Sequence, residues 1–169
     1  RNVSFTVSQG EMRAVVGPTG AGKSTLGCLC TRLYEPDRGS VLLRGKPLSA
    51  LSPGEIRRRM AVAGGRGWLL SGTVRRNLAM AAPDAAEDAL WAALRDAQAE
   101  AFVAAAGGLG AAVDQGGVNF SGGQRQRLVL AQALVRESEV LILDDCTSAL
   151  DAPTERRGLE AVRQRGQTG

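Results

Sequence analysis

Apolar and polar positions follow two different periods along the chain. Short runs with a two-residue period, or with continuous apolar character, predict strands at 3–7, 11–16, 40–45, 60–64 and 139–144. Helical spacing predicts helices at 23–33, after Pro53, and after Ser121, whose hydroxyl suits an N-cap. The run 139–144 is typical of a strand buried on both faces. Alternating strands and helices predict an α/β fold with a parallel sheet.

The middle of the chain has a different character. Residues 73–106 are rich in Ala, Leu, Arg and acidic residues, and Leu90, Leu94 and Ala97 have helical spacing. A glycine-rich loop follows at 107–117. We therefore predict a single domain in which an α-helical subdomain, 67–128, is inserted into a core made of 1–66 and 129–169.

Composition narrows the possible functions. The 169 residues are 44% hydrophobic and contain three cysteines without CxxC spacing and no histidine, so a zinc site or a disulfide framework is not expected, and a reducing compartment fits. No apolar run approaches the roughly 18 residues of a membrane span. The chain opens on RNVSF without an initiator Met. We therefore expect a fragment that is truncated at both ends, without a span or a signal peptide of its own.

The net charge of +4 comes from scattered arginines, and the densest run is RRR at 57–59. Two interpretations of this run are open. It can be the solvated face of a helix, or a basic patch for nucleic acid. The helix interpretation is favoured, so we expect no direct nucleic-acid partner.

The sequence GPTGAGKST, 17–25, matches the phosphate-binding pattern G-x-x-x-x-G-K-[ST] between a predicted strand and a predicted helix. Glycines let the backbone N–H groups converge on a polyphosphate at the positive end of a helix. Lys23 would add a mobile positive charge, and Ser24 would offer a hydroxyl to Mg²⁺. The nucleotide-binding residues expected here are Gly17, Pro18, Thr19, Gly20, Ala21, Gly22, Lys23, Ser24 and Thr25.

A second motif is LILDDCTSALD, 141–151, in which an apolar strand ends in two carboxylates. Strand ends of a parallel sheet collect at one edge, which places these acids beside the phosphate loop. We expect Asp144 to bind Mg²⁺ together with Ser24, and Asp145 to lie nearer the attacking water. Two acids next to a phosphate would repel it unless a metal ion and Lys23 offset their charge. The pair is therefore an argument for Mg²⁺ as an obligatory cofactor beside the nucleoside triphosphate, which we expect to be ATP.

The segment NFSGGQRQR, 119–127, resembles the signature motif of ATP-binding cassette (ABC) ATPases. WLLSGTVRRNL at 68–78 and SALD at 148–151 are similar to further segments of the exporter type. The resemblance implies a RecA-like P-loop NTPase core with a parallel sheet, a small antiparallel β element near the N-terminus and an inserted α-helical subdomain. It also implies a transport-coupled ATP hydrolase at the cytoplasmic face of the cell membrane.

In this family two ABC domains pair head to tail, as a homodimer or a heterodimer, beside a transmembrane domain that is fused upstream or separate. The signature of one domain then covers the ATP of the other. The resemblance gives that role to Ser121, Gly122, Gly123 and Gln124, and it gives the role of the catalytic residue to Asp145.

The chain departs from the family pattern at several positions. Gly65 stands where the family has Gln, and Gln115 and Gly116 stand where exporters tend to have Glu-Arg. Asp145 replaces the usual Glu and is shorter by one methylene group. The family's switch His and adenine-stacking aromatic would lie outside the chain. One hypothesis is therefore that the chain is the slow or non-hydrolysing half of a heterodimeric exporter.

Three further interpretations stay open. The chain can belong to an exporter with ordinary hydrolysis, to a soluble ABC ATPase acting on ribosomes or DNA, or to a binding-only regulatory cassette. The transported substrate is not encoded in this part of the sequence, and the direction of transport follows from the resemblance alone.

Overall fold

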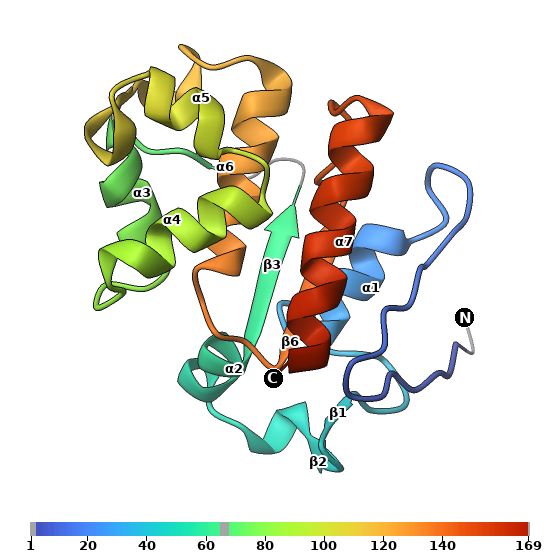
Figure 1. Cartoon of the computed structure of the whole chain (residues 1–169). Helices are drawn as coiled ribbons and strands as arrows, with labels where there is room; N and C mark the ends of the chain where they lie inside the picture. The colour runs from blue at the N-terminus through green and yellow to red at the C-terminus, as the bar shows by residue number, and fades with distance from the viewer. Residues whose placement is uncertain (1–2, 65–67, 169) are drawn as a thin grey trace.

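The computed structural model describes residues 3–64 and 68–168. Figure 1 shows a helical lobe on one side, a short parallel sheet with a long helix at the centre, and the N-terminal segment on the other side. This is the α/β arrangement that the sequence predicts, with a parallel pair of strands and small antiparallel pairs. No helix in the described ranges is long and apolar enough to cross a membrane.

The central sheet joins two strands that lie far apart in sequence. Strand β3 (Met60–Gly64) pairs in parallel with β6 (Val140–Asp144), from Met60 opposite Val140 to Gly64 opposite Asp144. Both strands were predicted from their apolar runs. A parallel pair needs a long crossover, and the helical lobe provides it. Strand β6 is covered by hydrophobic clusters on both faces, as expected, but its residues are only half-buried.

Alternation along β6 divides its side chains between two hydrophobic clusters. Leu141 and Leu143 pack on the larger cluster, which includes the helical lobe, whereas Val140 and Ile142 pack on the smaller one beneath the sheet. The smaller cluster also holds Leu43, Leu48, Leu51, Ile56 and Met60. Successive residues of a strand point to opposite faces, so neighbouring positions of β6 do not share one core.

The helical lobe follows the predicted order of elements. It consists of α3 (Val74–Ala79), α4 (Glu87–Asp96), α5 (Glu100–Ala105) and α6 (Gly122–Leu134). Two 3₁₀ turns, η2 (Gly108–Gly110) and η3 (Gln115–Gly117), and the antiparallel pair β4 (Gly72–Thr73) and β5 (Ala112–Val113) connect them. The helical spacing of Leu90, Leu94 and Ala97 is confirmed, because all three are buried.

The remaining elements surround the sheet. Helix α1 (Lys23–Cys30) contacts β6, and the hairpin of β1 (Leu42–Leu43) and β2 (Lys46–Pro47) is the small antiparallel element. The 3₁₀ turn η1 (Leu48–Ala50) leads to α2 (Pro53–Arg59), and α7 (Ala152–Thr168) follows β6. The RRR run forms the last turn of α2, where cations suit the helix dipole, as the helix interpretation predicts.

The predicted strands at 3–7 and 11–16 are absent. Residues 3–22 form no regular element except turns, and the side chain of Val15 is 49% exposed. The segment passes alongside α7, where a Cβ at Gly10 would lie 3.3 Å from the Gly166 carbonyl oxygen. An alternating sequence is not sufficient for a strand, because its N–H and C=O groups also need a neighbouring strand edge.

Candidate active site

The phosphate-binding pattern forms a tight loop that leads into α1. Gly20 and Gly22 have positive φ angles, 82° and 93°, which glycine adopts at low cost, and Gly22 is the N-cap of α1. Ala21 N–H donates to the Pro18 carbonyl at 3.2 Å and closes the turn. The loop and the first residues of α1 are exposed, so the unpaired N–H groups of the helix start are accessible to a ligand.

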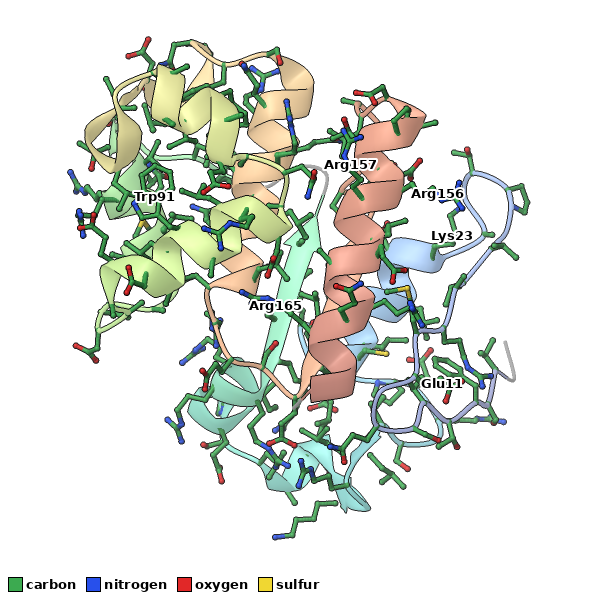
Figure 2. All side chains as sticks on the ribbon, in the orientation of Figure 1. Glu11, Lys23, Trp91, Arg156, Arg157 and Arg165 are labelled. Atoms are coloured by element: carbon green, nitrogen blue, oxygen red, sulfur yellow. The ribbon has the colours of Figure 1, made fainter. Side chains whose placement is uncertain are left out.

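Lys23 is the first residue of α1, and its side chain folds back over the loop. The Lys23 ammonium donates to the carbonyls of Gly17 at 2.8 Å and Pro18 at 2.9 Å. Figure 2 shows Lys23 near the tip of α1, on the side of α7 away from Trp91 and the helical lobe. A mobile cation is therefore held at the mouth of the loop by neutral acceptors, which a charged phosphate oxygen can replace.

Ser24 and Asp144 meet across the sequence. The Ser24 hydroxyl donates to Asp144 Oδ1 at 3.0 Å, although 120 positions separate the two residues. The contact arises because Asp144 ends β6 and α1 packs beside that strand. Hydroxyl and carboxylate oxygens are ligands that Mg²⁺ accepts, and the structure brings the two predicted metal ligands together. Within the described residues there is no cluster of three His, Cys, Asp or Glu for a metal.

Asp145 is exposed and begins the turn that follows β6. Its φ angle is 55°, in the left-handed region that few residues other than Gly, Asn and Asp adopt. The next residue, Cys146, points the other way, into the hydrophobic core. Burial raises the pKa of the Cys146 thiol to about 11, so this group stays protonated at neutral pH. The turn therefore exposes the carboxylate and buries its neighbour.

The signature segment forms the N-terminus of α6. Ser121 Oγ accepts from Gln124 N–H at 3.2 Å, and Gln124 Oε1 accepts from Ser121 N–H at 2.9 Å. This reciprocal capping box leaves other N–H groups of the first turn, including those of Gly122 and Gly123, available to an anion. The Gln124 side chain is thus engaged in capping its own helix.

The phosphate loop and the signature segment do not meet within the chain. Figure 1 shows α1 and α6 on opposite sides of α7. Among the described residues, no hydrogen bond joins residues 17–25 to 121–124. The two helix starts are therefore separate in space within this chain.

Comparison with known proteins identifies the family. The family described as "ABC transporter" matches residues 1–148. The chain belongs to the ABC transporter family. The uncharacterized ABC transporter ATP-binding protein YfiB of Bacillus subtilis is 41% identical over 96% of this chain and 28% of its own length. An ATP-dependent lipid A-core flippase of Alcanivorax borkumensis is 40% identical over 97% of this chain and 28% of its own length.

A solved structure extends the comparison to three dimensions. This ABC chain matches a bacterial Atm1-family ABC exporter with ATP bound, with a TM-score of 0.91 and 32% identity over 97% of this chain and 29% of that chain. The chain thus spans less than a third of the length of these relatives.

The departures from the ABC pattern are only partly within the described residues. Gly65 lies outside them. Gln115 and Gly116 lie in η3, where Gly116 has a φ of 70° and its N–H donates to the Leu69 carbonyl at 2.9 Å. This bond joins the loop before the signature to the 68–70 segment.

The sequence of this ABC chain did not predict the residues that join the turn after β6 to the helices on either side of it. On the side of the signature helix, Gln126, in the second turn of α6, bonds to three residues of that turn. On the side of α7, Thr147 Oγ1 donates to Glu155 at 2.7 Å. Asp151 accepts from Thr154 N–H at 2.9 Å and so holds the start of α7. The QRQR sequence was the available signal for Gln126, but only the fold shows what it contacts.

Proposed function

We propose that this chain binds Mg-ATP and, as one of a head-to-tail pair of ABC domains, hydrolyses it to drive export of a substrate across a membrane. The observation that carries the proposal is the contact of Ser24 with Asp144 at 3.0 Å, together with the Lys23 ammonium, which bonds to two carbonyls of the same loop. Three groups with distinct roles toward a metal-bound triphosphate are thereby gathered at one loop.

In this proposal residues 17–25 bind the phosphates. The loop and the positive end of α1 supply N–H donors, and Lys23 exchanges its two carbonyl partners for charged phosphate oxygens. Ser24 and Asp144 would hold Mg²⁺, which supplies positive charge that offsets the phosphates when it is bound. Their oxygens suit this ion, which typically uses one or two protein groups together with phosphate and water.

Asp145 is the proposed base. Its carboxylate would accept a proton from a water whose oxygen attacks the γ-phosphorus, while the bond from that phosphorus to the β–γ bridging oxygen breaks. The products are ADP and phosphate. A carboxylate that is one methylene group shorter than Glu places its oxygen more than about 1 Å away, and a misplacement of about that size costs on the order of 10²-fold in rate. The site of this chain is therefore proposed to be slow.

Pairing with a second ABC domain follows from the two separate anion sites. The start of α6, with Ser121, Gly122 and Gly123, would face the phosphates held by the partner. Gln124 would support this turn through its capping bond. The division into a core, 1–66 and 129–169, and a helical subdomain, 67–128, belongs to the same proposal. The grouping of α3, α4 and α5 on one side of the sheet supports it, whereas α6 (Gly122–Leu134) crosses the boundary at 128/129 and packs on β3.

The relatives favour transport over a role on DNA or ribosomes. Those compared above include a lipid A-core flippase and an exporter. By analogy we propose a transmembrane domain as partner and a place at the cytoplasmic face of the membrane. The substrate would be chosen by that other domain.

Lys23→Ala tests the proposal in the full-length protein. Loss of a charge-assisted bond costs about 1.5–3 kcal/mol, so we expect Mg-ATP affinity to fall by about 10-fold or more in calorimetry. Lys46→Ala is the matched control, because Lys46 is an exposed lysine of the β1–β2 hairpin. Equal affinities for the two variants would overturn the proposed function.

A further inference from the structure

Gln126 connects the signature helix to the turn after β6 with both ends of its side-chain amide. Its Nε2 donates to the Asp145 carbonyl at 3.3 Å and to Ser148 Oγ at 3.0 Å, and its Oε1 accepts from Ala149 N–H at 2.8 Å. Ser148 Oγ in turn donates to the Asp145 carbonyl at 3.4 Å. We call this set of contacts the Gln126 bridge.

The Gln126 bridge holds a backbone that needs support. Asp145 has a φ of 55°, a conformation that persists in a non-glycine residue only when its surroundings fix it. The direction of its carboxylate depends on that backbone. The carbonyl of the same residue accepts two bonds of the bridge, so the bridge resists rotation of the peptide that follows Asp145.

Beside the Gln126 bridge, the start of α6 packs closely against the turn 147–150. A Cβ at Gly123 would lie 2.8 Å from the Ala149 carbonyl oxygen and 3.4 Å from a methyl group of Leu150. The start of α6 therefore rests directly on the turn 147–150, and movement of either one displaces the other.

We propose that Gln126 is a positioning residue that sets the Asp145 carboxylate and the signature turn 121–124 as one rigid unit. The proposal rests on the proposed function, in which Asp145 serves the chain's own ATP and the signature turn serves the ATP of the partner. Through the Gln126 bridge, a shift of the signature turn against one nucleotide would change the carboxylate beside the other.

Two variants separate the parts of the Gln126 bridge. Gln126→Leu removes the three bonds that the Gln126 amide makes, whereas Gln126→Glu keeps an acceptor for Ala149 N–H and loses the donors to Asp145 and Ser148. Gln132→Leu is the matched control, since Gln132 is also half-buried on α6 and its amide donates to the Asn77 carbonyl at 3.1 Å, within the helical lobe.

In the full-length protein we expect both Gln126 variants to lower kcat for ATP by about 10-fold to 100-fold, with KM within about threefold of wild type. Hydrogen exchange at the Ala149 amide should accelerate in Gln126→Leu and stay near wild type in Gln126→Glu. The Gln132→Leu variant should change neither kcat nor this exchange rate.

Wild-type kcat in Gln126→Glu, or a loss of kcat no larger than in Gln132→Leu, would overturn the positioning role. An unchanged Ala149 exchange rate in Gln126→Leu would overturn the bridge itself. Failure of the proposed function would give a different result. ATP turnover would then be independent of Lys23, while the hydrogen-exchange rate of the Ala149 amide would still report on the Gln126 bridge.

Discussion

At the scale of single residues, Gly122 and Gly123 are adjacent glycines with different amounts of space. A Cβ at Gly123 would meet the Ala149 carbonyl oxygen at 2.8 Å, whereas one at Gly122 would lie 3.8 Å from the Ala149 Cβ, an ordinary contact. The carbonyl belongs to the backbone, so it cannot rotate away as a side chain would. The second glycine of the signature is therefore required for packing.

This difference predicts opposite effects on stability. Gly123→Ala should lower the free energy of unfolding by about 1–3 kcal/mol, because the turn 147–150 must shift. Gly122→Ala, the matched control in the first turn of the same helix, should be neutral or stabilising by up to about 1 kcal/mol, because alanine favours helix. Urea unfolding of both variants measures the contrast, and equal stabilities would contradict the close approach.

The sequence predicts which residues meet in the candidate site where the spacing of a motif defines them. The 17–25 pattern and the apolar run before Asp144 predicted that Ser24 and Asp144 would meet, and the structure brings them to 3.0 Å. The capping role of the Gln124 side chain and the contacts of Gln126 were missed. These depend on which segments the fold places side by side, and a local pattern does not contain that information.

At the scale of elements, Glu139 joins α2, the β1–β2 turn and β6. The Glu139 carboxylate pairs with Arg59 at 2.6 Å and with Arg44 at 2.7 Å, and its backbone N–H donates to the Arg59 carbonyl at 2.8 Å. The hydrogen bond from Arg59 is the main cause that lowers the pKa of Glu139 below its ordinary 4.5, and Arg44 adds to it. The charge pairs thus lie where β3 and β6 begin.

The lowered pKa of Glu139 determines the direction in which stability changes with pH. A carboxyl group whose pKa is lower in the folded state contributes stability above its unfolded pKa, and this is lost as pH falls through the folded value. We expect Glu139→Gln to lower the melting temperature by about 1–3 °C at pH 7, and this difference from wild type to shrink as the pH falls below 4.5. Glu137→Gln, an exposed control two residues away, should show no such pH-dependent difference.

Elements with their own local signals were predicted well. Pro53 and the N-cap Ser121 predicted two helix starts that the structure confirms. The capping boxes at these starts, Ser52 with Glu55 and Ser121 with Gln124, were not part of the prediction. The strands predicted at 3–7 and 11–16 were wrong, since a strand depends on a partner edge that its own sequence does not specify. For the same reason Val15, which we would place in the sheet core from its pattern, is exposed.

At the scale of the whole molecule, the proposed base belongs to a turn that suits aspartate. Asp145 has a φ of 55°, and aspartate adopts this left-handed region more readily than glutamate does. The shorter side chain is therefore compatible with the backbone of this chain, although in the proposed function it would place the carboxylate farther from a water at the γ-phosphate. The proposed catalytic role would favour the longer glutamate at position 145, whereas the left-handed backbone favours aspartate.

The hypothesis of a slow half-site can be tested at Asp145 in the assembled protein. Asp145→Glu should raise ATP turnover by about 10-fold or more, because the carboxylate gains reach, and should lower stability slightly, because the longer side chain fits the left-handed backbone less well. The gain can require Gly65→Gln as well, since groups that position one water act together. Asp145→Asn is the control of equal size, and it should lose whatever turnover this site supports. A wild-type homodimer that turns over at about 1–10³ per second, and slows on Asp145→Asn, would contradict the slow-site hypothesis, because aspartate would then be a fully working base.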